Sequence, residues 1–183
     1  MRGLEDCIAA GGVAVFPSDT VYGLACDPGD AAAVARLYAL KGRPPGKPSA
    51  VMYFNRDAAL AALREVGPRT RVMLEALLPG ALTVVLASGG LRVPDLPEFA
   101  DVRRPVLQSS ANLSGEPDPR RLEDVPQSIR DGADLVLDGG ELPGTPSTVV
   151  DLRDFERDGT WRVLRAGAVP EATVAAAAGT LGA

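Results

Sequence analysis

The sequence predicts an α/β fold, a single domain in which helices flank one twisted mixed sheet. Short apolar runs rich in Val and Leu alternate with longer segments of helical character along the chain. Some gaps between these runs are only long enough for a hairpin, whereas others hold a helix, so we expect both antiparallel and parallel strand pairs. We see no internal repeat and no stretch of linker composition. Residues 1–183 are therefore assigned to one domain.

Glycine and proline mark the ends of most predicted elements. Gly11 and Gly12 end a short N-terminal helix, and Gly42 stops a helix that Asp30 caps. Pro68 opens another helix at its first turn. The expected strands are 13–16, 49–54 (central in the sheet), 82–86, 91–93, 105–109, 135–138, 148–151 and 161–165. A short N-terminal helix is expected to end at residue 10. The other expected helices span 31–41, 57–65, 68–78, 122–129 (interrupted by Pro126) and 170–178, and residues 95–104 are unassigned.

Composition excludes several classes of function. The chain is 46% hydrophobic but only 4% aromatic, so its core must be built mainly from Val, Leu and Ala. The absence of His removes the commonest general base and metal ligand, and we expect no metal held by the protein. Cys7 and Cys26 are expected to be reduced thiols. With no signal-like N-terminus and no apolar run that could span a membrane, we expect a cytoplasmic protein without a membrane partner.

A basic, proline-rich loop gives the strongest local sign of a ligand. No Asp or Glu occurs between residues 31 and 56, although the whole chain has a net charge of −5. The cations left without a nearby acid are Arg36, Lys41, Arg43, Lys47 and Arg56. Fixed cations on a restrained loop suit a polyanion such as a nucleoside triphosphate, because Arg offers a planar fork and Lys a point charge. The alternative is a loop that is merely solvated.

Polar side chains also gather at the ends of predicted strands, at 18–22, 109–112 and 147–148. Open α/β sheets bind ligands at such positions, although Ser18 or Asp19 could instead cap an ordinary turn. The chain has no Walker A loop, no dinucleotide fingerprint and no nucleophile elbow, and Ser without His is a poor nucleophile. Hydroxyl, amide and cationic donors instead orient an anionic substrate and stabilise charge at a phosphoryl centre. The residues alone therefore predict a binder or transferase of phosphorylated small molecules.

Seven short motifs follow one another along the chain. They are Ser18-Asp19-Thr20-Val21-Tyr22-Gly23-Leu24, Lys41-x-Arg43-Pro44-x-x-Lys47-Pro48, Pro79-Gly80-x-Leu82-Thr83, Arg92-Val93-Pro94, Ser109-Ser110-Ala111-Asn112-x-Ser114-Gly115, Ser147-Thr148-Val149-Val150-Asp151 and Arg165-x-Gly167. Together they resemble the threonylcarbamoyl-AMP synthase family, the YrdC-like domain. The resemblance covers residues 5–170, and residues 171–183 form an expected C-terminal helix and tail.

This resemblance implies a fold, a reaction and partners. The fold is a YrdC-like twisted α/β sheet with a concave basic cavity. The reaction is a nucleotidyl transfer that converts L-threonine, bicarbonate and ATP into threonylcarbamoyl-adenylate and pyrophosphate, for N6-threonylcarbamoyladenosine modification of tRNA. Mg²⁺ is expected to accompany ATP. The expected downstream partner is tRNA or a tRNA-modifying threonylcarbamoyl transferase complex, and double-stranded RNA is a further candidate.

The resemblance also implies roles for individual residues. The expected catalytic residues are Lys41, Arg43, Ser110 and Asn112. The expected ATP-binding residues are Arg43, Lys47, Ser110, Asn112 and Arg165. The expected threonine-binding residues are Thr20, Arg92, Ser109 and Ser147, and Arg92 suits the carboxylate of the amino acid.

Two other functions stay open. A non-catalytic RNA-binding or ribosome-assembly module of the same fold should have a broad basic surface and a broken Lys-x-Arg or Ser-x-Asn pair. A carbamoyl-transfer relative of the hydrogenase-maturation type should carry flanking zinc-finger and acylphosphatase-like segments. The acidic overall charge and the intact pairs favour the synthase. Segments 86–92 and 94–105 are shorter than the usual family pattern, so we expect a more open cavity there.

Overall fold

Nine strands form one twisted mixed sheet in residues 2–44 and 49–179, the part of the chain that this computed structural model describes. The strand order is β7-β1-β2-β6-β3-β5-β4-β8-β9, so β3 lies at the centre as expected. Parallel pairs (β1–β7, β3–β5 and β4–β8) occur among antiparallel ones, which confirms the predicted α/β class with a mixed sheet. The strands are β1 (Ala14–Pro17), β2 (Tyr22–Cys26), β3 (Ala50–Met52), β4 (Leu82–Leu86), β5 (Gly89–Arg92), β6 (Val106–Ser110), β7 (Leu135–Val136), β8 (Thr148–Asp151) and β9 (Arg162–Arg165).

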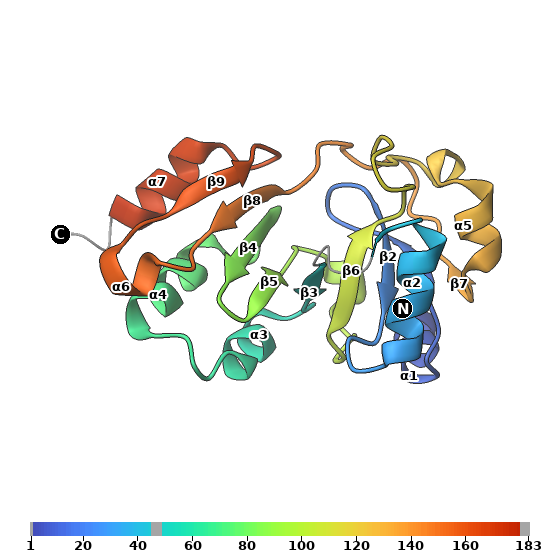
Figure 1. Ribbon diagram of the computed structural model, residues 1–183, viewed down its shortest axis with the longest axis horizontal. Coiled ribbons are helices and arrows are strands. Elements are labelled where there is room, and N and C mark those ends of the chain that lie inside the picture. The colour runs from blue at the N-terminus through green and yellow to red at the C-terminus, as the bar shows by residue number, and fades with distance from the viewer. Residues whose placement is uncertain (1, 45–48, 180–183) are drawn as a thin grey trace.

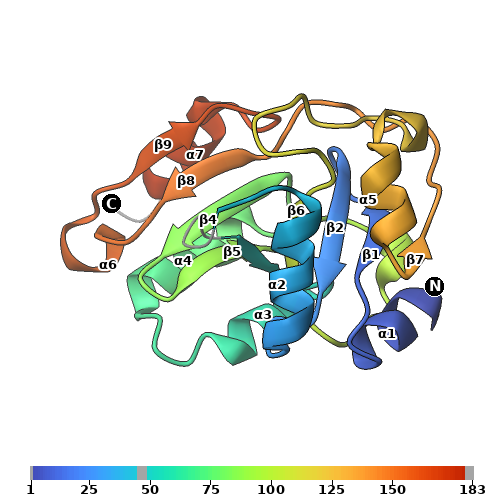
Figure 2. The same cartoon turned by 45° about the vertical axis from the view of Figure 1, so that its right-hand side comes forward.

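Helices flank the sheet at both of its ends. Figure 1 shows α4 and α7 beside β4 and β8 at one end, and Figure 2 brings α2 and α5 forward at the other end. Alternation along β1 directs Val15 into the cluster that includes α2 and α5, and Phe16 into the cluster that includes α1 and η1. The helices are α1 (Arg2–Ala9), α2 (Ala31–Leu40), α3 (Arg56–Ala62), α4 (Pro68–Leu77), η1 (Pro97–Phe99), η2 (Leu122–Asp124), α5 (Gln127–Gly132), α6 (Phe155–Asp158) and α7 (Glu171–Gly179).

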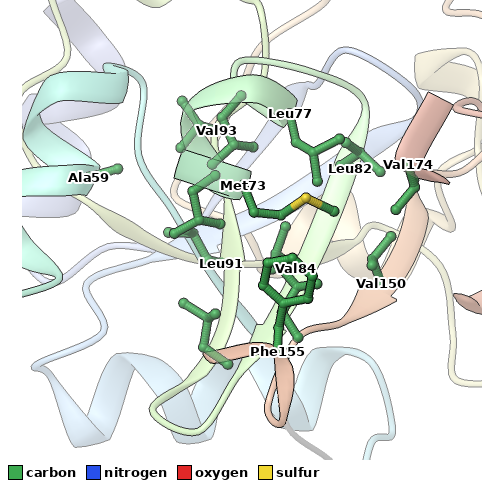
Figure 3. Close-up of a cluster of buried hydrophobic side chains, with 14 of the residues drawn as sticks. Ala59, Met73, Leu77, Leu82, Val84, Leu91, Val93, Val150, Phe155 and Val174 are labelled. Carbon is green, nitrogen blue, oxygen red and sulfur yellow. The ribbon is translucent and has the colours of Figure 1, made fainter. Parts of the chain in front are cut away.

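A third apolar cluster packs one face of β4 and β5. Leu82 and Val84 of β4 meet Met73 of α4 and Phe155 of α6 in this cluster, as Figure 3 shows. Because side chains alternate along a strand, the residues between these apolar ones lie on the opposite face of the sheet. Burial of one face by α4, α6 and α7 therefore leaves the other face of β4 and β5 available for a cavity.

The structure corrects one predicted element and adds detail to two other segments. Tyr22–Cys26 is a buried strand, not part of a polar strand end, and its small residues explain the miss: a Cβ on Gly23 would lie 2.8 Å from Nε2 of Gln108. Pro126 interrupts the helical segment at 122–129 as expected, with η2 before it and α5, which continues to Gly132, after it. Residues 97–99 form η1 in the unassigned segment. None of the helices within residues 2–44 and 49–179 has both the length and the apolar character needed to cross a membrane.

Candidate active site

A cavity of about 310 Å³ lies against the face of β3, β4, β5 and β6 that the helical cluster leaves uncovered. Alternation directs Thr83 and Val85 of β4 and Arg92 of β5 into it, opposite Leu82, Val84 and Leu91 in the core. Seven side chains with an expected role line this one cavity: Thr20, Arg43, Arg92, Ser109, Ser110, Ser147 and Arg165. The structure therefore brings together residues that are up to 145 positions apart in the chain (165 − 20).

The end of α2 delivers Arg43 to the cavity. Asp30 caps the start of the helix, as expected, by accepting hydrogen bonds from the backbone N–H groups of the first turn. Gly42 then adopts φ +57°, a conformation that glycine reaches without a steric penalty, and the chain turns away from the helix axis. The Arg43 guanidinium donates to Oγ of Ser109 at 3.2 Å and lies 5.8 Å from the ring centroid of Tyr38.

Lys41 lies beneath the cavity and does not line it. Its ammonium is buried and donates to the carbonyl oxygen of Ser110, to the carbonyl oxygen of Asn112 at 2.8 Å and to Oδ1 of Asn112 at 2.9 Å. The backbone carbonyl of Lys41 also accepts from the N–H of Ser114 at 2.9 Å. Burial, with the nearby charge of Arg43, lowers the pKa of Lys41 to about 8, and the charge of Asp118 opposes that change.

Asn112 shares this buried arrangement with Lys41. Its Oδ1 accepts from Oγ of Ser110 at 2.6 Å as well as from Lys41, and its amide donates to the carbonyl oxygen of Glu116. Asn112 is 7% exposed, so these contacts occupy both ends of its side-chain amide. Lys41 and Asn112 thus hold the loop at 110–116 in place, and Ser110 is the member of the group that reaches the cavity.

Arg92 is the most deeply buried cation of the cavity. Its Nη2 donates to Oδ1 of Asp19 at 2.6 Å and its Nη1 to Oε1 of Gln108 at 3.1 Å. Burial lowers the pKa of Arg92, and the ion pair with Asp19 partly offsets that effect. Asp19 thus pairs with a distant residue, whereas Ser18 does stabilise the local turn by donating to the carbonyl of Val21 at 2.6 Å.

Ser147, Thr83 and Arg165 form a polar group on the far side of the cavity. Arg165 donates from Nη2 to the carbonyl oxygen of Ser147 at 2.7 Å and to its Oγ at 3.2 Å. The hydroxyls of Ser147 and Thr83 lie 2.8 Å apart. A Cβ on Gly167 would lie only 2.2 Å from the carbonyl oxygen of Pro146, so only glycine lets this segment approach β8. The Arg165-x-Gly167 spacing therefore places the arginine on Ser147.

Sequence reasoning gave no role to Thr83, Gln108 and Asp118, did not predict the partner of Asp19, and misjudged two cations. Thr83 and Gln108 could have been found as polar residues within apolar strands, whereas the pairing of Asp19 and the position of Asp118 depend on the tertiary fold. Arg36 and Arg56 were expected to lack a nearby acid, but each pairs with an acidic residue outside residues 31–56. Arg36 pairs with Asp134 at 2.5 Å and Arg56 with Asp57 at 3.7 Å. Lys47, expected to bind ATP, lies outside the described residues.

The chemistry that this arrangement offers is binding and charge stabilisation. Guanidinium groups and hydroxyls line the cavity, and no His exists to activate any of its Ser residues. Within the described part of the chain, no three His, Cys, Asp or Glu side chains cluster as metal ligands would. An anionic substrate would thus meet fixed donors that stabilise developing charge on phosphoryl or carboxylate oxygens.

Comparison with known proteins places the chain in a family. The sequence model of the Sua5/YciO/YrdC family, described as "Telomere recombination", matches residues 6–167. The threonylcarbamoyl-AMP synthase of Pseudomonas aeruginosa is 37% identical over 79% of this chain and 88% of its own length. That of Pyrococcus abyssi is 31% identical over 81% of this chain, which spans only about half (49%) of that protein's length.

A solved structure gives the same relationship. P. abyssi Sua5 complexed with L-threonine superposes with a TM-score of 0.82 at 27% identity, covering 96% of this chain and 56% of that one. The fold of the described residues agrees with this match. The chain belongs to the Sua5/YciO/YrdC family.

Proposed function

We propose that this protein is a nucleotidyltransferase that makes threonylcarbamoyl-adenylate and pyrophosphate from L-threonine, bicarbonate and ATP. The observation that carries the proposal is the single cavity that gathers the arginines Arg43, Arg92 and Arg165 with the hydroxyls of Ser109, Ser110 and Ser147. Relatives at 31–37% identity are named threonylcarbamoyl-AMP synthase, and a P. abyssi relative of the same fold binds L-threonine. Two anionic substrates in one site require this kind of donor set.

For the described residues, position in or below the cavity supports the roles that we propose. Arg43, which follows the end of α2, binds the ATP phosphates together with Lys47, and Ser110 and Arg165 contact the nucleotide. Lys41 and Asn112 act from beneath, because they fix the loop that carries Ser110 and keep positive charge below the phosphates. Thr20, Arg92, Ser109 and Ser147 bind threonine.

The chemistry needs no side-chain nucleophile. The amine of threonine adds to CO₂ supplied by bicarbonate and loses a proton, which gives a carbamate. A carbamate oxygen then bonds to the α-phosphorus of ATP as the bond from that phosphorus to the pyrophosphate oxygen breaks. The protein's part is to align the two substrates and to stabilise charge on the phosphoryl oxygens with Arg43 and Arg165.

Mg²⁺ enters this scheme as part of the ATP substrate. Magnesium bound to nucleotides typically keeps several waters and takes one or two carboxylates together with phosphate oxygens. Asp118 lines the cavity and is the carboxylate that suits this arrangement. The adenylate would then pass to the machinery that modifies a tRNA adenosine, in the cytoplasm.

Product analysis tests the proposal. The purified chain is incubated with MgATP, L-threonine and ¹³C-bicarbonate, and the products are separated and weighed by mass spectrometry. The expected product is an adenylate that contains threonine and carries the ¹³C label. Formation of AMP or ADP without a labelled adenylate would contradict the proposal. Omission of threonine is the control that removes the labelled product and leaves ATP intact.

A further inference from the structure

Arg92 is a cavity arginine whose charge is matched by a buried acid. The side chains of Arg92 and Asp19 are only 4% and 9% exposed, and their charged atoms lie 2.6 Å apart. Because the two opposite charges lie so close together, their fields largely cancel at longer range and the pair acts nearly as a neutral unit. Since both side chains are buried, solvent and salt do little to screen the two charges from each other. Asp19 therefore removes most of the net positive charge that Arg92 would otherwise add to the cavity.

Arg165 is held in a different way on the same cavity. Its donors reach the carbonyl and hydroxyl oxygens of Ser147, which are neutral, and no acid within the described residues forms an ion pair with it. Asp118, the acid that lines the cavity, acts electrostatically on Lys41. Among the three arginines of the cavity, Arg165 and Arg92 thus differ, because Arg165 keeps its net charge and Arg92 is neutralised by Asp19.

Arg92 remains a hydrogen-bond donor despite this neutralisation. A guanidinium carries five N–H groups, and the contacts with Asp19 and Gln108 use one each from Nη2 and Nη1. The ion pair is single-point, since Oδ2 of Asp19 and Nε of Arg92 have no hydrogen-bond partner among the described residues. The two contacts fix the plane of the guanidinium and leave an N–H on each Nη.

We propose that Asp19 is a specificity-determining residue that sorts the two anionic substrates between the arginines of this cavity. Electrostatic attraction grows with the charge of the ligand, so neutralising Arg92 weakens its pull on a polyphosphate far more than on a carboxylate with a single charge. The carboxylate of an amino acid still binds, because the oriented N–H groups of Arg92 donate to it. The inference rests on the proposed function, because it concerns which substrate each arginine takes.

Competition between the substrates tests this role. L-Threonine is titrated by calorimetry into the full chain, with and without saturating α,β-methylene-ATP and Mg²⁺, for the wild type, Asp19→Asn and Asp27→Asn. Asp27 is the matched control: it loses the same charge, does not line the cavity and lies 3.9 Å from Arg104. We expect the analogue to change the threonine Kd less than about twofold in the wild type and in Asp27→Asn. In Asp19→Asn it should raise that Kd by about tenfold or more, or ~1.4 kcal/mol.

A second variant covers the case in which Asp19→Asn does not fold, since it leaves Arg92 buried without its acid. Asp19→Asn/Arg92→Gln removes both charges of the pair. It should bind the analogue as the wild type does and lose about tenfold or more in threonine affinity; unchanged threonine affinity would overturn the inference. An Asp19→Asn protein in which the analogue leaves the threonine Kd unchanged would overturn the inference about Asp19 but not the proposed function. A wild type that binds the analogue but no threonine would overturn the proposed function as well.

Discussion

The surroundings of two cations at the end of α2 depend on the conformation of one turn. Gly42 reverses the chain after the helix, so that Lys41 is buried below the cavity and Arg43 lines it. Lys41 has a pKa of about 8 because it is buried and the charge of Arg43 lies nearby. The two cations of the Lys-x-Arg pair are therefore tested separately, Arg43 by mutation and Lys41 by pH.

The first prediction concerns Arg43→Ala. Loss of a charge-assisted contact worth about 1.5–3 kcal/mol should weaken ATP binding by ~10–150-fold. Since Arg43 is only partly buried, the free energy of unfolding should change by about 1 kcal/mol or less. Calorimetric titration with α,β-methylene-ATP and thermal denaturation measure the two effects. Arg56→Ala, which removes an exposed arginine paired with Asp57, is the control that should bind normally. Equal affinities of the two variants would return Arg43 to the role of a solvated loop residue.

The second prediction concerns pH and Lys41. If ATP binding requires the ammonium, its Kd should be steady below pH 8 and rise by about tenfold near pH 9, as the group loses its proton. The contribution of Lys41 to the free energy of unfolding should instead increase as the pH rises. The unfolded chain keeps the Lys proton up to about pH 10.4, so between pH 8 and 10.4 it binds more protons than the folded chain, and the Lys41 contribution to stability rises with pH.

Binding and melting curves measured at each pH from 7 to 9.5 separate these effects. Arg43→Ala tests the assignment of the step, because it retains Lys41 but loses the nearby charge that helps to lower the Lys41 pKa, so its step should remain and move above pH 8. A Kd that is flat over this range would mean that the charge of Lys41 does not act on the nucleotide.

At the scale of elements, the site depends on strand periodicity and on one close approach of two backbones. β4 and β5 give alternate residues to the core and to the cavity, as Val84 and Thr83 show. The segment after β9 lies on residues 146–148, where the N–H of Ala168 donates to the carbonyl of Pro146 at 2.9 Å. Gly167 permits this approach and so fixes Arg165 against Ser147.

The third prediction is that Gly167→Ala damages this part of the site. Its Cβ would lie 2.2 Å from a backbone oxygen, so the segment must move away from β8, which should cost about 1–3 kcal/mol of folding free energy. The hydrogen bonds from Arg165 to Ser147 should be lost with it, and product formation should fall. Gly179→Ala is the matched control, because nothing lies within 4 Å of its Cβ and Ala favours a helix. Normal melting and activity of Gly167→Ala would contradict the role given to this contact.

The sequence allowed prediction of elements that follow a strong local pattern. β4 and β8 have the predicted bounds, because alternating branched residues between turn signals define them. Tyr22–Cys26 was missed, since small residues chosen for close packing against Gln108 weaken the strand signal. The pairing of Asp19 with Arg92 could not be predicted either, because it joins positions 73 residues apart through the sheet. The motifs thus predict which residues form the site, and the fold decides which of them are in contact.

At the scale of the whole molecule, an acidic protein encloses a cavity with three arginines. The net charge is −5, whereas the cavity lining holds Arg43, Arg92 and Arg165 against the single acid Asp118 among the described residues. Such a contrast concentrates an anionic small molecule in the cavity and does not suit broad contact with nucleic acid. The charge distribution supports the synthase over a non-catalytic RNA-binding module.

The fourth prediction is amino-acid selectivity. If Thr20, Ser109 or Ser147 reads the substrate hydroxyl, serine should be a better substrate than valine. Serine lacks one methyl group, which a pocket discriminates by about 1–3 kcal/mol, or ~10–200-fold. Valine keeps the shape but would leave these buried hydroxyls unpaired, so rejection of ~10⁴-fold or more is expected. Values of kcat/KM for threonine, serine and valine test this, and valine above serine would place the threonine site elsewhere.

The most direct test of the central claim is the initial rate of pyrophosphate release from MgATP by the purified chain. Four mixtures are compared: complete, without L-threonine, without bicarbonate in CO₂-free buffer, and with the Arg43→Ala protein. The account predicts rapid release in the complete mixture alone, because the carbamate that attacks the α-phosphorus needs both co-substrates. Release that is equally fast without threonine would contradict the account, because the attacking group would then be water or another nucleophile.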